Sequence, residues 1–470
     1  MAAEIRANTF RALRKALGDN VKGCAAVLQG GTSEKFTFYC SDTDVTEFRQ
    51  EAFFRYLFQL NEPDCYGVLD LEREESILYV PVVSPESERW QGPARKPEWY
   101  TETYGVTTTE NTPNLADSLH ARGITKLLVL KGLNTDSGME TQTTAKFPGI
   151  EKFEVDESIL HPVLCELRVI KTDREIEHLR RACRMSAQAH TYVMRHIKPG
   201  MTELQCEMLF KAWAGYFGAA RHMAYTCICA SGAHGSILHY GHAGYPNNRV
   251  LEDGDMIVLD MGAEYAGYST DLTRSYPVNG KFTDDQRKVF NAVLAAQKAV
   301  YARLRPGTSW PEMHRLSERV ILEHLVEMGI LKGSIEEMEK AFVASLFMPH
   351  GLGHLLGLNV HDVGGYPCGT HRSKEKGLSY LRCGRTLQKG MVLTVEPGLY
   401  FNKPWIEQGL KDPNVAKFVN VEKLEPFYAF GGVRLEDDIL ITEDGYENLS
   451  GSWPTTPEEI EGVISAAQRS

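Results

Sequence analysis

The sequence predicts an α/β (α+β) protein with two domains, an N-terminal domain over residues 1–165 and a C-terminal domain over residues 166–470. The 470 residues exceed what one hydrophobic core usually holds, so two domains are expected. Short apolar runs alternate with helical patterns along the first domain, which is typical of a sheet flanked by helices. The second domain contains the same pattern of helices and strands twice, which predicts two related halves.

Composition argues against several classes of partner. The formal net charge of -11 disfavours nucleic acids and anionic membranes, because both are polyanions. No apolar run approaches the length of a membrane span, and the first 20 residues read as an amphipathic helix without the apolar centre of a signal peptide. The ten cysteines are scattered and contain no CxxC pair, which favours a reducing, cytoplasmic location.

The strands expected in the first domain are apolar runs between turn signals, at residues 24–29, 65–70, 76–81 and 126–131. Gly30 and Gly31 follow the first run, but the GxGxxG spacing and a Walker lysine are missing from this stretch. The first domain therefore carries no predicted nucleotide-binding loop.

The second domain is expected to open with two helices, and the same pair returns later in the chain. Residues 172–175 form a capping box, in which the Thr hydroxyl and the Glu carboxylate satisfy free amide groups at a helix start. The helix that follows ends at the Pro-Gly pair 199–200, and another helix begins after it. Residues 283–286 are again a capping box, and an amphipathic helix is predicted over 312–329.

A matching strand follows each helix pair. Residues 254–262 (GDMIVLDMG) and 390–398 (GMVLTVEPG) align without a gap, so that Asp260 falls on Glu396 and the outer glycines coincide. We interpret this match as an internal duplication, in which two α/β halves face each other across a shared site.

Carboxylates at strand ends are the first candidate functional residues. Asp260 follows the apolar run 256–259, and Asp271 lies close behind it, although Asp packs poorly in strands. Buried carboxylates that face each other repel unless a cation lies between them. The alternative is that both are aspartates that cap turns. Glu436 lies on a further predicted apolar strand, two residues after Arg434, where an ordinary ion pair is the alternative.

Histidines in glycine-rich stretches add to this set. His350 and His354 are four residues apart, as in the HExxH zinc helix, but Pro349 and the intervening glycines predict a loop instead. His239 and His361 also have glycine neighbours. Such a histidine is more often a hydrogen-bonding residue than a metal ligand, and that alternative stays open for each.

One arrangement would join the acids and a histidine in a single site, composed of Asp260, Asp271, His354, Glu396 and Glu436. Four carboxylates and one neutral imidazole carry a charge of about -4, which balances two divalent cations. Oxygen-rich ligands without thiolate favour manganese, magnesium or cobalt over structural zinc. Two such ions can activate a shared water and polarise a carbonyl, so this site would suit amide hydrolysis.

At these positions the chain resembles the pita-bread metallopeptidases, which include methionine aminopeptidase, aminopeptidase P and prolidase. The segments LDMGAEY with STD, MPHGLGH, VLTVEPG and GGVRLED are similar to the metal-binding segments of that family. LHYGHAG, NVHDVGGYP and the opening domain are most similar to its prolidase branch. The resemblance covers nearly the whole chain. It implies a creatinase/prolidase-like α/β domain, followed by a pita-bread domain with internal pseudo-twofold duplication.

The resemblance also implies roles for individual residues. Asp260 would hold one ion, Asp271 and Glu436 would bridge two ions, and His354 and Glu396 would complete the second. Glu396 would also manage the proton of the attacking water. The remaining roles fall into two groups: the scissile amide or its tetrahedral intermediate would contact His239, His350 and His361, and the substrate pocket would include Arg382, Tyr225 and Arg434.

Two of these substrate-pocket residues have more specific roles. Arg382 would receive the carboxylate of the product proline, for which the alternative is a solvated loop charge, and Arg434 would support Glu436.

The activity implied is hydrolysis of dipeptides with C-terminal proline (Xaa-Pro) by a hydroxide that bridges two divalent metal ions. Manganese is the expected metal, with cobalt, zinc or magnesium able to replace it in vitro. A homodimer is also implied, in which the N-terminal domain would narrow access and aromatic residues such as Trp90 would reach the neighbouring active site; the alternative for Trp90 is simple packing. The alternatives are an aminopeptidase P that acts on longer peptides and a non-catalytic binding protein on the same scaffold.

Overall fold

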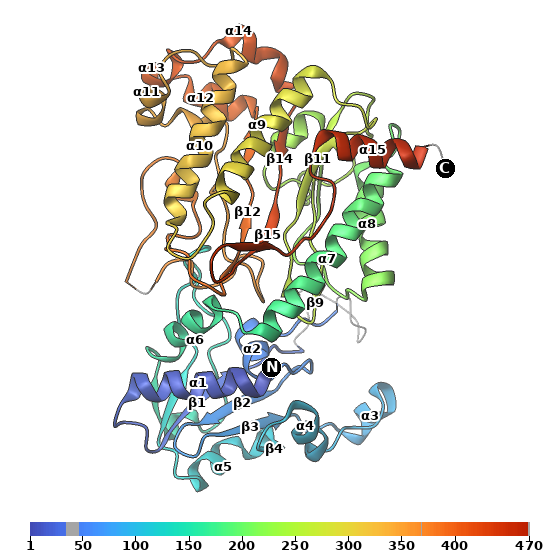
Figure 1. Cartoon of the computed structure of the whole chain (residues 1–470). Helices are drawn as coiled ribbons and strands as arrows, with labels where there is room; N and C mark the ends of the chain where they lie inside the picture. The colour runs from blue at the N-terminus through green and yellow to red at the C-terminus, as the bar shows by residue number, and fades with distance from the viewer. Residues whose placement is uncertain (34–46, 368, 469–470) are drawn as a thin grey trace. The chain divides into compact units, whose positions relative to one another are not determined.

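The computed structural model describes residues 1–33, 47–367 and 369–468. They fall into two compact units, Met1–Arg168 and Val169–Ser470 (Figure 1). Both units mix helices with strands, so the predicted α/β fold class is confirmed. The boundary at 165/166 and the role in dimerisation and access given to the first domain remain predictions.

The first unit is built on a six-stranded sheet with the strand order β4-β3-β2-β1-β5-β6. The neighbours of β1 differ in direction, because β2 pairs with it antiparallel and β5 pairs with it parallel. Side chains from these strands form an apolar core with α5. The strands of the sheet are β1 (Cys24–Gln29), β2 (Tyr66–Asp70), β3 (Glu75–Val80), β4 (Thr108–Asn111), β5 (Lys126–Val129) and β6 (Glu154–Asp156). The helices are α1 (Ala2–Leu17), α2 (Ala52–Phe58), α3 (Pro85–Gln91), α4 (Pro97–Tyr104), α5 (Leu115–Ala121) and α6 (Leu160–Val169), the last of which crosses the unit boundary.

The second unit contains the two expected helix pairs, α7 (Asp173–His196) with α8 (Glu203–Gly218) and α9 (Asp284–Tyr301) with α10 (Trp310–Glu327). The capping boxes predicted at Thr172 and Thr283 are both present. A third capping box, at Thr202, opens α8. The local sequence therefore determines where α7, α8 and α9 begin.

Strands of the second unit repeat the duplication seen in the helices. β8 (Met256–Asp260) pairs antiparallel with β11 (Thr273–Pro277), and β12 (Val392–Val395) pairs antiparallel with β15 (Asp437–Ile441). Asp260 ends β8 and Glu396 follows β12, whereas Asp271 and Glu436 lie just before β11 and β15. Each half thus places two acids at the same end of its strand pair.

The remaining elements surround these strand pairs. The strands are β7 (Ile228–Ser231), β9 (Glu264–Tyr265), β10 (Tyr268–Ser269), β13 (Gly398–Tyr400), β14 (Gly432–Arg434) and β16 (Tyr446–Asn448). The helices are α11 (Ile335–Lys340), α12 (Lys403–Gly409), α13 (Pro413–Ala416), α14 (Val421–Leu424) and α15 (Pro457–Gln468). None of the helices in the described ranges has both the length and the apolar composition needed to cross a bilayer.

One prediction for this region is wrong. The sequence placed Glu436 on a continuous strand, but β14 ends at Arg434 and β15 begins at Asp437. Glu436 lies in the break, where it forms an isolated bridge with Thr273 of the other half. The run is apolar enough for one strand, but pairing with β13 on one side of the break and β12 on the other divides it.

A buried arginine ties the two halves together at this break. The side chain of Arg274, which is 0% exposed, donates hydrogen bonds to the carbonyl oxygens of Thr273 and Glu436, both at 2.9 Å. It also donates to Asp437 at 2.8 Å. The ends of β11 and β15 are therefore held side by side, which fixes the spacing between their acids.

Gly262 provides a test of this packing. A Cβ atom at Gly262 would collide with the carbonyl oxygen of Thr270, the residue before Asp271. We predict that Gly262→Ala destabilises the protein by about 1–3 kcal/mol in denaturant-induced unfolding, because the backbone has to move. Gly462→Ala in α15 is the matched control, since nothing lies within 4 Å of its Cβ position. An equal effect of both substitutions would contradict the packing argument.

Candidate metal centre

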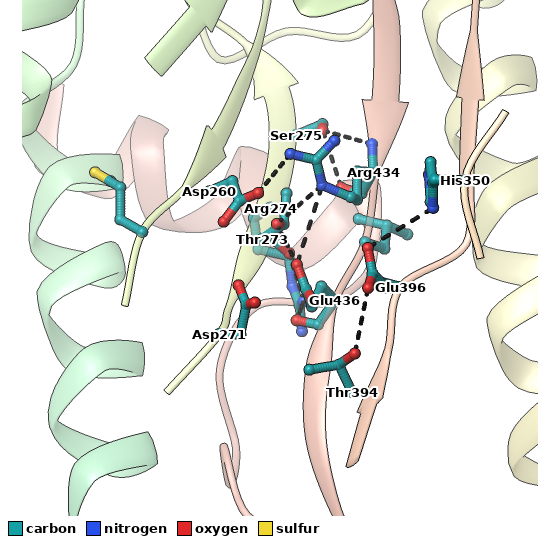
Figure 2. Close-up of polar contacts among 12 residues, drawn as sticks. Asp260, Asp271, Thr273, Arg274, Ser275, His350, Thr394, Glu396, Arg434 and Glu436 are labelled. Atoms are coloured by element: carbon teal, nitrogen blue, oxygen red, sulfur yellow. Dashed lines mark hydrogen bonds and ion pairs between the residues drawn. The ribbon is translucent and has the colours of Figure 1, made fainter. Parts of the chain in front are cut away.

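The five residues proposed as ligands converge from separate parts of the chain. Three overlapping groups have ligand atoms that all lie within 4.8 Å of one another: Asp260, Asp271 and Glu436; His354, Glu396 and Glu436; and Asp271, His354 and His361. Figure 2 shows the four carboxylates gathered near the ends of strands from the two halves. The third group adds His361, which the sequence assigned to the substrate, to the same cluster.

Hydrogen bonds orient these side chains. His354 Nδ1 lies 3.0 Å from the Leu355 carbonyl oxygen. A carbonyl oxygen can only accept a hydrogen bond, so Nδ1 carries the proton and donates it. Its Nε2 atom then faces Asp271 Oδ2 at 3.3 Å and Glu396 Oε1 at 3.6 Å. When a ligand histidine donates a hydrogen bond from one ring nitrogen, here Nδ1, its other nitrogen, here Nε2, is directed towards the metal.

The acids are oriented by neighbouring threonines. Thr273 Oγ1 donates to Glu436 Oε2 at 2.7 Å, and Thr394 Oγ1 donates to Glu396 Oε1 at 3.3 Å (Figure 2). Within the described residues, Asp271 Oδ1 and Glu436 Oε1 are buried without a hydrogen-bond partner. Buried carboxylate oxygens are costly when they lack a partner, so both atoms fit a role as metal ligands.

Electrostatics at the cluster also fit a cation. Burial raises the pKa of Glu396 to about 7, and the Asp271 charge adds to this although His354 opposes it. Burial raises the pKa of Glu436 well above its usual range, and the charges of Asp271 and Glu396 act in the same direction. The carboxylates therefore resist ionisation together, and oxygen donors in such a group are the ligands that divalent cations prefer.

The same surroundings also raise the pKa of His354, which favours its charged form. Burial alone would lower its pKa, but the hydrogen bond to Asp271 and the charge of Glu396 raise it to about 9. The two neighbouring carboxylates thus favour a positive charge at this position.

Arg434 contacts more groups than the sequence predicted. Its Nε atom forms an ion pair of 4.0 Å with Oε2 of Glu436, the expected partner, and its Nη2 atom also donates a hydrogen bond to Asp260 (Figure 2). The Tyr225 hydroxyl donates to the other oxygen of Asp260. Arg434 thus links β14 to the end of β8 across the two halves.

Tyr400 is a site residue that the sequence analysis missed. Its hydroxyl accepts from Arg434 Nη1 at 2.8 Å and lies 2.9 Å from His350 Nε2. Burial lowers the pKa of His350 to about 3, and the Arg434 charge adds to the effect, so the imidazole is neutral. The available signal was weak: Tyr400 is the only aromatic residue on the short strand after Glu396.

All of the predicted site residues line one cavity of about 1010 Å³. Its lining includes the four acids together with His239, His361 and Arg382. Burial lowers the pKa of His239, and the charges of Arg434 and Arg382 reinforce this, so His239 is a neutral group. Apolar parts of the wall come from Ile228, Ile237, Leu238, Val360, Pro404 and Trp405. The lining of the cavity thus combines charged and polar side chains with apolar ones.

Comparison with protein families places this centre in a known group. The sequence profile of metallopeptidase family M24 matches residues 177–443, which make up more than half of the chain and include every residue of the acid cluster. The chain belongs to metallopeptidase family M24. The profile of the aminopeptidase P N-terminal domain matches residues 10–126. The family resemblance seen in the sequence is confirmed, and the chain is a peptide hydrolase with a metal-binding site.

Individual members of family M24 resemble the chain along nearly its whole length. The Xaa-Pro dipeptidase of Homo sapiens is 47% identical over 95% of this chain and 90% of its own length. A protein of Botryotinia fuckeliana described as a probable Xaa-Pro aminopeptidase is 36% identical over 91% and 90%. The solved structure of Zn substituted Escherichia coli aminopeptidase P in complex with product has a TM-score of 0.77 and 32% identity, with 98% of each chain covered.

Metal binding by this M24 centre is expected to depend on pH. Divalent ions bind neutral imidazole and ionised carboxylate, so they must displace protons from His354, with a pKa of about 9, and from Glu396, with a pKa of about 7. We predict that affinity for Mn²⁺ rises from pH 6 to pH 9, by roughly tenfold per pH unit for each proton displaced.

Equilibrium dialysis of the metal-free protein measures this affinity. In the variant His354→Gln the rise between pH 7.5 and pH 9 should become shallower, because one of the groups that loses a proton on metal binding is gone. An affinity that does not change with pH in the unsubstituted protein would contradict the charge arrangement.

Proposed function

We propose that the chain hydrolyses dipeptides whose C-terminal residue is proline. The proposal rests on one observation: the acid cluster and Arg382 line the same cavity, in a chain 47% identical to a human Xaa-Pro dipeptidase. A guanidinium in that wall suits a substrate whose carboxylate is only one residue from the scissile bond, because guanidinium and carboxylate match in geometry and charge.

Two divalent ions would be held by the five residues of the cluster, Asp260, Asp271, His354, Glu396 and Glu436. When bound, such ions supply the polarisation of a peptide carbonyl and the acidification of water. We propose manganese as the natural metal, because four carboxylates and a single imidazole form an oxygen-rich set. The zinc-substituted structure of the E. coli relative supports testing zinc beside manganese, cobalt and magnesium.

Protons and charge would be managed by residues of the chain itself. Glu396 lies in the acid cluster, where its carboxylate would accept the proton of the attacking water and pass it on. The imidazole of His239 is neutral and lines the cavity, where it can donate a hydrogen bond to the scissile amide. The neutral His350 also lines the cavity, but its Nδ1 proton is donated to the Gly351 carbonyl oxygen at 2.8 Å, so it would reach the substrate through Nε2, which lies beside the Tyr400 hydroxyl. Fixed donors of this kind stabilise the charge that develops on the carbonyl oxygen, without reorganisation of water.

Aminopeptidase P activity on longer peptides is the second candidate. The cavity volume of about 1010 Å³ lies at the upper end of the range of roughly 300–1,000 Å³ that is common for sites of drug-sized ligands, and a dipeptide is smaller. The similarity to aminopeptidase P structures points the same way. The greater identity to the human dipeptidase favours the first candidate.

We also propose that the protein works as a homodimer in the cytoplasm. The side chain of Trp90 on α3 is 77% exposed, which suits contact with a second subunit. The cysteines in the described ranges are free thiols, as expected in a reducing compartment.

Substrate length separates the two candidate activities. With Mn²⁺ present, we predict hydrolysis of Gly-Pro with a kcat/KM at least tenfold above that for the tripeptide Arg-Pro-Pro, because only the dipeptide places its carboxylate one residue from the scissile bond. Chromatographic assay of released amino acids measures both rates. Efficient cleavage of the tripeptide alone would favour the aminopeptidase.

Substitution of Arg382 tests the carboxylate contact. We predict that Arg382→Ala raises the KM for Gly-Pro roughly 10- to 100-fold, since a charge-assisted hydrogen-bonded pair is lost. Arg382→Lys keeps the charge but not the paired geometry, so its KM should lie between that of the unsubstituted protein and that of Arg382→Ala. Steady-state kinetics measure this series. Unchanged KM values would exclude Arg382 from substrate binding.

A further inference from the structure

An ion pair outside the cavity anchors the segment that carries two site histidines. The Nζ atom of Lys171, just before the cap of α7, lies 2.9 Å from Asp362 Oδ2, and each side chain is only 1% exposed. Asp362 follows His361 directly. Neither Lys171 nor Asp362 is among the described residues that line the cavity, whereas His361 is.

Backbone contacts show how tightly this anchor defines the segment. The Asp362 amide donates to the Leu355 carbonyl oxygen at 2.9 Å, so the chain turns back beside His354. The Ser269 amide donates to the Gly357 carbonyl oxygen at 2.8 Å. A Cβ at Gly357 would collide with the Asp362 carboxylate, and only glycine leaves room for the ion pair there. The turn is thus built around the buried carboxylate.

This anchor places His361 against the metal centre. The ring centroids of His354 and His361 are 4.4 Å apart in an edge-to-face arrangement. One nitrogen of His361 lies within 4.8 Å of ligand atoms of Asp271 and His354. A small shift of the backbone at Asp362 would move the imidazole of its neighbour, and displacement of a reacting group by about 1 Å can cost roughly 100-fold in rate.

A buried ion pair contributes little net stability to a fold. Desolvation of both charges offsets much of their attraction, and apolar replacements are often equally stable. Its directional contact, however, fixes a geometry that apolar packing would leave looser.

We propose that Lys171 and Asp362 are positioning residues that hold His361 over the metal centre. This inference rests on the proposed function, in which His361 contacts the substrate. The two residues act through His361 and do not touch the reacting atoms.

A double-mutant cycle with Gly-Pro and the Mn²⁺-loaded full chain tests the proposal. We expect Lys171→Met to lower kcat roughly 10- to 100-fold, with KM changed less than about threefold and bound metal unchanged. In the His361→Ala background the same substitution should lower kcat less than about threefold, because its target is already gone. Lys171→Arg, which can keep the ion pair, should restore most of the activity.

Two further variants keep the test decisive. Lys171→Met removes the positive charge beside the buried Asp362 carboxylate, so the charge-neutral pair Lys171→Met with Asp362→Asn carries the same cycle if the single variant does not fold. Arg180→Met is the control: it removes the ion pair of 2.7 Å between Arg180 of α7 and Glu447 of β16, neither of which is among the described residues that line the cavity, and it should keep full activity.

Each outcome has one meaning. Equal losses of kcat in both backgrounds, or loss of bound metal, would overturn the positioning role and leave the proposed function intact. Full activity of His361→Ala would overturn the role of His361 and the positioning proposal together, while hydrolysis of Gly-Pro would still stand. A drop of kcat only when His361 is present supports the proposal.

Discussion

The cost of gathering four carboxylates in one buried place is the constraint on which the rest of the second unit depends. Asp260, Asp271, Glu396 and Glu436 would repel one another strongly if all were ionised without a cation. Arg434 offsets part of this charge at Asp260, and a protonated His354 does so between Asp271 and Glu396. These two cations do not balance four acids, which is why the centre suits divalent metal ions.

Duplication of a simple unit supplies the acids in matching places. Each half contributes an antiparallel strand pair with one acid after the first strand and one before the second. Arg274 holds the two strand pairs side by side through hydrogen bonds from its side chain to backbone carbonyl oxygens. The positions of these acceptors do not depend on side-chain rotamers. Rigid strands thus carry the charged groups, while loops rich in glycine bring the histidines.

Local sequence signals predicted much of this arrangement. Capping boxes gave helix starts, and the match between 254–262 and 390–398 gave the duplication and the cluster of acids. The break before Asp437, the pairing of Arg434 with Asp260 and the contact of Tyr400 with His350 were not predicted. Spacing along a chain tells which residues share a face of one element. It does not tell which partner from another element will meet them, and that choice decides these three contacts.

Metal titration of the metal-stripped protein, with bound metal and Gly-Pro hydrolysis followed together, tests whether the acid cluster holds the metal ions needed for activity. We expect two tightly bound Mn²⁺ ions per chain, activity that reaches its full value only as the second ion binds, and loss of both effects in Glu436→Gln. Full activity in the stripped protein, or in a Glu436→Gln variant that holds no metal, would contradict this expectation.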